Sequence, residues 1–207
     1  MKKALFFDLD DTIYSTESVV DDMYKELFDL LRPKVGEEVL QGIRTDVLTM
    51  PFHVVADRYA LDNGLKDEAL RLALDMRYNG PMETFKDYAL TLDIPAEKFL
   101  ITAGYVKLQK SKIQQLGIEK DFKGIFIPDP YKSDLTKLDI FKMIMNKYEY
   151  SPSDILVIGD NPESEILAGM DLGIDTYLYD FEGKFSPALA DFYGTSYENL
   201  HEIVSRN

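Results

Sequence analysis

The sequence predicts an α/β protein with a doubly wound parallel sheet and an inserted segment that is entirely helical. Two observations carry this prediction. From residue 82 onward, short apolar runs alternate with segments of helical periodicity, which is typical of a parallel sheet built from βα units. Between residues 15 and 81, apolar residues recur only at helical spacing. We therefore expect a core formed by residues 1–14 and 82–207, with residues 15–81 inserted after the first strand.

The composition is that of a soluble globular protein, with 45% hydrophobic residues in 207. A formal net charge of -14 argues against nucleic acid or an anionic membrane as a partner, because the protein's field would repel both. The chain has no cysteine, which excludes disulfides, thiol catalysis and thiolate metal sites. The N-terminus has too few apolar residues for a signal peptide, and no run approaches the roughly 18 apolar residues of a membrane span. We expect a cytoplasmic protein.

The first strand delivers two carboxylates to its end. Ala4–Phe7 has the length and aromatic character of a buried strand, and Asp8 and Asp10 follow it two positions apart. An extended backbone would direct both side chains the same way, where each would raise the pKa of the other unless a cation lay between them. Hard carboxylate oxygens suit Mg²⁺, whose coordination is commonly completed by substrate phosphate oxygens. The spacing therefore predicts a Mg²⁺ site and indicates phosphoryl chemistry.

Three helical patterns are expected in the insert, over residues 16–31, 37–59 and 66–78. Thr16 can cap the first helix, which Pro33 and Gly36 end. The second pattern is interrupted at Pro51. The turn signal Asp62-Asn63-Gly64 separates the second helix from the third.

In the second part of the core, strands are expected at residues 99–102, 124–127, 155–158 and 176–179, and helices at 82–92, 105–116, 134–148, 162–171 and 196–204. Thr195 and Glu198 form a candidate capping box for the last helix. Ligands of open α/β sheets gather at the carboxyl ends of strands, near the point where the strand order reverses. Thr102 and Asp160, which end two of these strands, are therefore candidate site residues.

The sequence Asp8-x-Asp10-x-Thr12, directly after an apolar strand, resembles the first motif of the haloacid dehalogenase (HAD) superfamily, most of whose members are phosphatases. The resemblance implies that Asp8 is a nucleophile that becomes an aspartyl-phosphate, and that Asp10 is the general acid and base. A covalent intermediate divides one difficult displacement into two easier ones. The alternative is an acidic turn after a strand. The helical insert resembles the small cap that many of these phosphatases carry at this position.

The sequence FLITAG, with Thr102 at the strand end, resembles the second motif of the family. The resemblance implies that the Thr102 hydroxyl and the backbone N–H of Ala103 hold phosphate oxygens. In this family Asn-Gly often follows, whereas Ala103-Gly104 stands here, so side-chain contacts at position 103 stay open. A threonine at this place can also be purely structural.

The sequence ILVIGDNPESE resembles the fourth motif, Gly-Asp followed by a second acid four or five residues later. By this resemblance Asp160 joins Asp8 and Asp10 around the metal. Glu165 matches the second acid, where the family more often has Asp, and is an additional candidate because acids also suit any first helical turn. The Asn-Pro after Asp160 has the preferences of an N-cap and a first helical residue.

The third motif of the family is a lysine, for which the sequence offers Lys123, Lys132, Lys137 and Lys142. In one large group of relatives this lysine precedes the aspartate of the fourth motif by 23 positions, which is the separation of Lys137 from Asp160. Lys137 also lies in the first turn of a predicted helix, where a cation opposes the macrodipole, and a residue placed against its local preference is a candidate for function. It would offset the charge of Asp8, Asp160 and the phosphate.

Together, the motifs predict a Mg²⁺-dependent phosphatase that acts on a small phosphorylated metabolite. Asp8 would attack the phosphorus in line, and Asp10 would protonate the leaving alkoxide and then activate water. A phosphomutase stays open, and so does a 5′-nucleotidase, because the opening FFDLDDTIY resembles the pyrimidine 5′-nucleotidase group.

Three other classes fit the sequence less well. Dehalogenases of the superfamily lack an acid at the position of Asp10, and a receiver-like signalling module would have adjacent acids and a phospho-acceptor on a later strand. A non-catalytic phosphate-binding relative is opposed by the complete acid set. No metal role is expected for His53 or His201, because neither has a second ligand at a suitable spacing.

Overall fold

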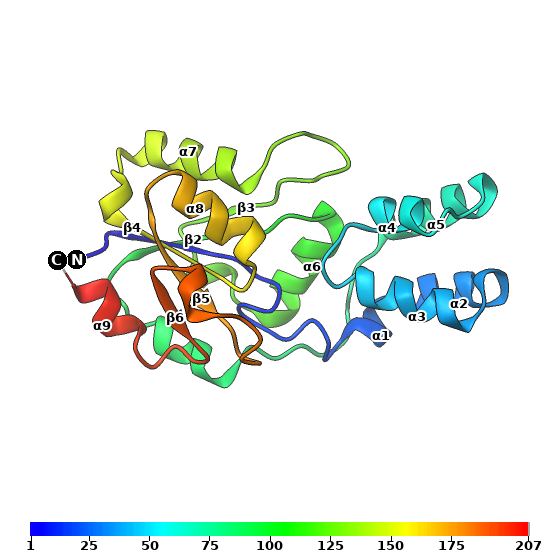
Figure 1. Ribbon diagram of the computed structural model, residues 1–207, viewed down its shortest axis with the longest axis horizontal. Coiled ribbons are helices and arrows are strands. Elements are labelled where there is room, and N and C mark those ends of the chain that lie inside the picture. Colours follow the sequence, from blue (N-terminus) through cyan, green and yellow to red (C-terminus); the bar gives the residue numbers. More distant parts are fainter. Residues whose placement is uncertain (207) are drawn as a thin grey trace.

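The computed structural model describes residues 1–206, which form a six-stranded, all-parallel sheet flanked by helices (Figure 1). The strands are β1 (Ala4–Phe7), β2 (Glu97–Ile101), β3 (Gly124–Phe126), β4 (Ile155–Gly159), β5 (Asp175–Tyr179) and β6 (Phe192–Gly194). Their order in the sheet is β3-β2-β1-β4-β5-β6. The order reverses between β1 and β4, so the predicted doubly wound class is confirmed and these two strands form the topological switch point.

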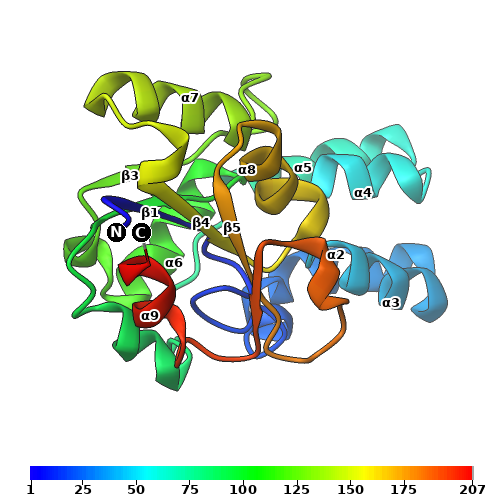
Figure 2. The ribbon, with the colours of Figure 1, turned by 60° about the vertical axis from the view of Figure 1, so that its left-hand side comes forward.

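The sheet is buried on both faces. Side chains of Ala4 and Phe6 pack on one face, and those of Leu5 and Phe7 on the other, and all four are at most 1% exposed. Figure 2 shows α7 and α8 above the sheet and α6 and α9 below it. These helices are α6 (Val106–Leu116), α7 (Lys137–Tyr148), α8 (Leu167–Asp171) and α9 (Leu200–Ser205). Because both faces are covered, β1 reads as a continuous apolar run.

Five helices form a lobe at the end of the molecule opposite the two termini (Figure 1). They are α1 (Val20–Met23), α2 (Lys25–Val35), α3 (Glu37–Asp46), α4 (Phe52–Arg58) and α5 (Asn63–Asp75). We call α1–α5 the helical lobe. Residues 15–81 contain helices and turns but no strand, as expected, and Pro51 does separate two helices. Fully buried residues such as Leu27, Ile43 and Val55 hold the lobe together.

Three local expectations for the lobe are wrong. Thr16 does not cap a helix, because its hydroxyl donates to Asp11 Oδ2 at 2.6 Å and α1 begins later, without a side-chain cap. Pro33 lies inside α2, and only Gly36, with φ 75°, ends that helix. The signal at residues 62–64 does separate two helices, but the third helix begins there and not at residue 66, since Asp62 accepts the N–H of Leu65 at 3.1 Å as its N-cap. Turns and N-caps use the same side chains, so the sequence alone does not distinguish them.

In the core, two further expectations are corrected, and one strand was not expected. The segment 82–92 forms a short 3₁₀ helix, Lys86–Thr91, in place of an α-helix. The capping box of Thr195 and Glu198 is absent, because α9 follows Asn199. Strand β6 was missed, since three residues are too short to show a period. The other short helices are 3₁₀ segments at Glu119–Asp121, Pro152–Asp154 and Pro187–Leu189 and a π-helical turn at Pro162–Ile166.

Within residues 1–206, none of the helices combines the length and the apolar character that a membrane span requires.

Candidate active site

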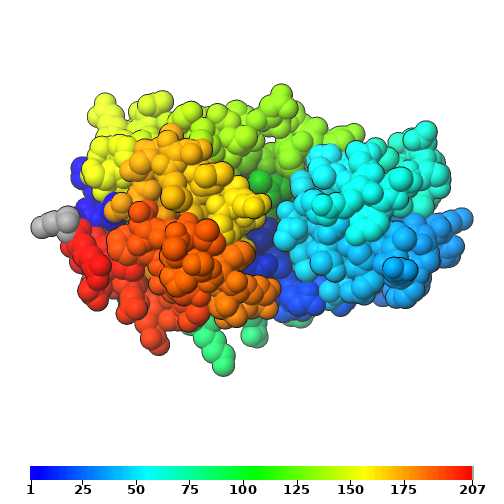
Figure 3. Space-filling view, viewed as in Figure 1, coloured from blue at the N-terminus to red at the C-terminus, as the bar shows by residue number. Residues whose placement is uncertain are grey.

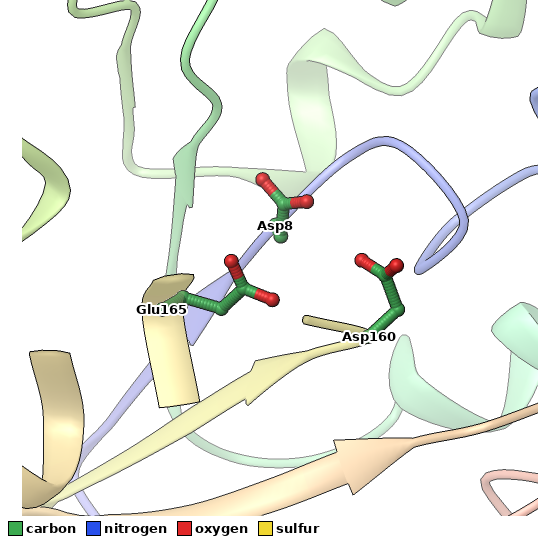
Figure 4. Close-up of side chains that lie close together, drawn as sticks. All are labelled: Asp8, Asp160 and Glu165. Carbon is green, nitrogen blue, oxygen red and sulfur yellow. The ribbon is translucent and has the colours of Figure 1, made fainter. Parts of the chain in front are cut away.

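Three carboxylates meet at the switch point between β1 and β4 (Figure 4). Asp8 directly follows β1, Asp160 directly follows β4, and Glu165 lies in the π-helical turn that leads into α8. One carboxylate oxygen of each residue lies within 4.8 Å of the other two. Asp8 is only 6% exposed and Glu165 only 1%. We call these three residues the acid cluster.

The turn after β4 explains why Gly-Asp precedes this helix. The Asn161 side chain accepts the N–H of Glu163 at 2.9 Å, which confirms the predicted N-cap. Glu165 reaches back, and its Oε1 accepts the N–H of Asn161 at 2.8 Å. A Cβ on Gly159 would lie 2.2 Å from Cγ of Glu165, so a side chain there would displace the glutamate. Gly159 therefore makes room for the acid that the sequence left as an additional candidate.

Of the four candidate lysines, Lys137 is the one whose ammonium group contacts the acid cluster. Its Nζ lies 2.7 Å from Asp8 Oδ1 and 2.6 Å from Glu165 Oε2. A capping box of Thr136 and Asp139 begins α7 immediately before Lys137, and so places the lysine at the carboxyl edge of the sheet. Lys123 and Lys132 pair elsewhere, with Glu97 and Asp129.

The acid cluster holds more negative charge than its ammonium group offsets. Burial raises the pKa of Asp8 to about 7, against the opposing effect of Lys137. Burial, with the neighbouring charges of Glu165 and Asp8, holds the pKa of Asp160 well above its usual range. Burial would lower the pKa of Lys137, but the adjacent carboxylates raise it. An additional cation would relieve this excess, and a donor set made only of hard oxygens fits Mg²⁺.

The carboxylate of Asp10 is not part of the acid cluster. Its Oδ1 accepts from Lys112 Nζ at 2.9 Å and from the hydroxyl of Tyr14, and its Oδ2 accepts from Gln109 Nε2 at 2.9 Å. Burial would raise the pKa of Asp10, but the charge of Lys112 and these hydrogen bonds lower it. Of the three expected Mg²⁺ ligands, the acid cluster therefore contains Asp8 and Asp160 but not the carboxylate of Asp10. Metal ligation by the Asp10 side chain stays a prediction that these contacts do not support.

Thr102 is joined to Asp10 through one glutamine. Thr102 follows β2 and is 1% exposed, and its hydroxyl accepts from Gln109 Nε2 at 2.6 Å. The same Nε2 contacts Asp10, so Gln109 links two residues that the sequence assigned to different motifs. The phosphate contact expected of Thr102 stays a prediction.

Sequence reasoning missed Gln109 and Lys112, although one signal was available. Both are polar residues on the buried side of α6, where Leu108 and Ile113 are also buried. Gln109 is only 2% exposed and Lys112 only 5%. A glutamine and a lysine on the inner face of a helix that begins directly after a site strand indicate a polar partner inside.

The loop after β1 is held by its own hydrogen bonds. Asp11 adopts φ 50°, and its carboxylate accepts the N–H of Thr16 at 2.8 Å. Thr12 donates its hydroxyl to Asp160 Oδ1 at 3.3 Å, which connects the loop to the acid cluster. Of the two histidines, His201 is exposed on α9, while Nδ1 of His53 lies 3.1 Å from the hydroxyl of Tyr105.

A cavity of about 200 Å³ lies between the core and the helical lobe. Figure 3 shows the corresponding hollow between the two parts of the surface. Asp8, Asp10 and Asp160 line the side formed by the core. The lobe contributes the opposite side, including Val20, Met23 and Phe52. The polar groups at the strand ends are therefore covered by the insert that leaves the core directly after them.

Parallel strands that present a lysine and buried carboxylates at their switch point define an α/β protein with an acidic centre at the carboxyl edge of its sheet. The chain belongs to the haloacid dehalogenase-like hydrolases, whose family model matches residues 2–173.

The individual relatives share little sequence identity with this chain. The glyceraldehyde 3-phosphate phosphatase of Pyrococcus furiosus is 21% identical over 225 residues, which cover 99% of this chain and 93% of the relative. The putative HAD-hydrolase YfnB from Bacillus subtilis, solved bound to magnesium, has a TM-score of 0.71 at 17% identity, with 99% of each chain covered. The L-2-haloacid dehalogenase of Xanthobacter autotrophicus has a TM-score of 0.63 at 15% identity, covering 99% of this chain and 98% of its own. The structural likenesses establish the fold.

Proposed function

We propose that the chain is a Mg²⁺-dependent phosphatase that hydrolyses a small phosphorylated metabolite through an aspartyl-phosphate on Asp8. One observation carries the proposal. Two acids two positions apart are held by different cations, Asp8 by Lys137 and Asp10 by Lys112. Two carboxylates in separate environments can perform two different roles, one as nucleophile and one as acid and base.

Asp8 has an oxygen available for attack. Lys137 contacts Oδ1, and no residue among 1–206 donates a hydrogen bond to Oδ2. In the first step Oδ2 forms a bond to phosphorus while the bond from phosphorus to the ester oxygen breaks. Lys137 offsets part of the negative charge that gathers there. When bound, Mg²⁺ would be held by Asp8 and Asp160 and would neutralise charge on the phosphoryl oxygens.

Asp10 would transfer the protons. In the first step its carboxyl group gives a proton to the leaving alkoxide, and in the second it takes a proton from the water that attacks the phosphorus. The second step needs the ionised form, which Lys112 and Gln109 favour here. The first step needs the protonated form, which the negative charge of an incoming phosphate would favour. Hydrolysis then releases inorganic phosphate and restores Asp8.

We also propose that residues 15–81 act as a cap. The cavity wall opposite Asp8 comes from the helical lobe, and His53 of the lobe contacts Tyr105 of the core. Covering the site would exclude water and strengthen the fixed charges. A cavity of about 200 Å³ is below the roughly 300–1,000 Å³ of pockets for drug-sized ligands, so it favours a small sugar phosphate over a nucleotide.

The phosphatase relative from Pyrococcus furiosus supports phosphate ester hydrolysis. Dehalogenase chemistry is the alternative that the fold allows, but it needs no acid at the position of Asp10, and here that acid has three partners. A phosphomutase differs only in the fate of the phosphoryl group.

The experiment is a panel of phosphomonoesters, with 2-chloropropionate as the dehalogenase substrate, assayed with Mg²⁺ and with EDTA. We expect phosphate release that needs Mg²⁺, and no chloride release. Chloride release, phosphate release that EDTA leaves unchanged, or an isomeric phosphate ester as the main product would each overturn the proposal.

A further inference from the structure

We infer that the cavity selects phosphomonoesters whose leaving group is small and uncharged, and that it discriminates against a second anionic group. This inference rests on the proposed function and adds the class of substrate. It follows from the charges that line the cavity between the core and the helical lobe.

Every cation that lines the cavity is already paired. The lining contains five carboxylates, of Asp8, Asp10, Asp11, Asp160 and Glu165, and two ammonium groups, of Lys112 and Lys137. Lys112 is bound to Asp10, and Lys137 is bound to Asp8 and Glu165. Within the described lining, no cationic side chain remains for a carboxylate or a second phosphate on the substrate.

The wall from the helical lobe is uncharged. It is formed by aliphatic, thioether, hydroxyl and aromatic groups, among them Val20, Met23, Tyr24, Thr49, Met50 and Phe52. Two arginines flank the wall residues 47–52 in the sequence, and both are paired with acids of residues 15–81. Arg44 binds Glu17 and Asp21, and Arg58 binds Asp46.

An anionic leaving group would thus lie between the uncharged wall of the helical lobe and the carboxylates of the core. A charge that loses its water without gaining a partner is strongly disfavoured, and nearby like charges add to this cost. A hydroxyl or an aldehyde group loses far less hydration free energy. The carbon atoms of the leaving group are stabilised by contact with Met23 and Phe52. The transferred phosphate is the exception, because Mg²⁺ held by Asp8 and Asp160, as proposed above, would offset its charge.

The test compares two esters of the same carbon skeleton. Glycerol 3-phosphate and 3-phosphoglycerate differ in one terminal group, an alcohol in the first and a carboxylate in the second. We expect kcat/KM to be at least tenfold higher for glycerol 3-phosphate, which corresponds to about 1.4 kcal/mol. Both compounds are also measured as competitive inhibitors of p-nitrophenyl phosphate hydrolysis, where the carboxylate should weaken inhibition.

A charge variant tests the wall directly. Thr49 lines the cavity and is exposed in the turn between α3 and α4, so a longer side chain there does not disturb packing. Thr49→Lys places an unpaired cation in the wall and should raise the preference for 3-phosphoglycerate at least fivefold. Thr49→Gln adds length without charge and should leave the ratio of the two kcat/KM values within about twofold.

Equal kcat/KM and equal inhibition by the two esters in the unmodified protein would overturn the inference while leaving the proposed function intact. The same holds if Thr49→Lys and Thr49→Gln change the ratio equally. If no phosphomonoester of the wider panel is hydrolysed, the proposed function itself fails, and the inference fails with it.

Discussion

The ammonium group of Lys112 lies 2.9 Å from Oδ1 of Asp10, although 102 positions separate the two residues in the sequence. Both residues are largely covered, since the side chains are 7% and 26% exposed. Gln109, one helical turn before Lys112, contacts the other oxygen of the same carboxylate. Helix α6 therefore holds the carboxylate of Asp10 apart from the acid cluster, beside the nucleophile proposed at Asp8.

Replacing Lys112 tests whether this arrangement matters for turnover. Lys112→Met removes the charge but keeps an apolar stem of similar length, so Asp10 loses its cation and its fixed position. We expect kcat to fall at least tenfold with a smaller change in KM, because the acid and base acts on the reacting atoms and binds substrate little. Steady-state kinetics measure both constants, with the unfolding midpoint as a check of the fold.

The same helix offers a matched control. Lys107 also pairs with an acid, Asp75 of the helical lobe, but both side chains are about half or more exposed, at 45% and 70%. An exposed pair contributes only about 0–1 kcal/mol. Lys107→Met should leave kcat within about twofold. A Lys112→Met protein that is as active as this control would show that Asp10 does not depend on Lys112.

The second prediction concerns the nucleophile. Asp8→Asn keeps the size of the side chain and removes the nucleophilic oxygen. We expect kcat to fall more than a hundredfold, which corresponds to about 2.7 kcal/mol, with the circular dichroism spectrum unchanged. Turnover above about a hundredth of the unmodified rate would rule out Asp8 as nucleophile.

The third prediction separates the two acids that follow β4. Glu165 uses one oxygen for Lys137 and the other for the N–H of Asn161, whereas Asp160 accepts, from residues 1–206, only the long hydrogen bond from Thr12. Asp160 therefore has more capacity to bind a metal. Asp160→Asn should raise the Mg²⁺ concentration for half-maximal activity at least tenfold, because few carboxylates hold the ion. Calorimetric Mg²⁺ titration should show the same loss.

Two variants of the following helix complete this comparison. Glu165→Gln should lower kcat through Lys137 and change the Mg²⁺ requirement less than Asp160→Asn does. Glu163→Gln removes an exposed acid of the same turn and should leave the Mg²⁺ titration unchanged. If Glu165→Gln weakens Mg²⁺ binding more than Asp160→Asn, the assignment of the two acids is reversed.

The fourth prediction concerns stability at acidic pH. Asp180 follows β5, is 4% exposed, and accepts from the N–H of Phe185 at 2.7 Å, the N–H of Lys184 at 3.0 Å and the hydroxyl of Tyr193 at 3.0 Å. Burial would raise its pKa, but these hydrogen bonds lower it. Because the pKa is lower in the folded state, the stabilisation is present above about pH 4 and is lost as the pH falls through the folded value.

Asp180→Asn should therefore lower the free energy of unfolding at pH 7 by roughly 1–3 kcal/mol, since N–H donors lose a charged acceptor. The difference from the unmodified protein should shrink as the pH falls below about 4. Urea unfolding at several pH values measures it, with Glu182→Gln as the control for an exposed acid of the same loop. A difference that does not change with pH would contradict the role given to the carboxylate.

Much of this site could be predicted because the signals are local. The apolar run of β1 places Asp8 at a strand end, and Gly-Asp-Asn-Pro, which begins with the last residue of β4, specifies both a strand end and a helix start. The capping box that begins α7 likewise depends on two residues three positions apart, Thr136 and Asp139. Elements with weak local signals were missed or misjudged, such as the three-residue strand β6 and the cap of α9.

What the sequence by itself determined is the order of the elements, the two faces of the sheet and the acids at its edge, because strand burial and helix capping act between near neighbours. Only the tertiary structure decided which lysine pairs with which acid. Lys137 joins Asp8 across 129 positions, and Lys112 holds Asp10 across 102. These pairs depend on where α6 and α7 pack on the sheet, and that position results from the summed burial of apolar side chains over the whole core. No sequence pattern near Asp8 or Asp10 indicates where α6 and α7 pack.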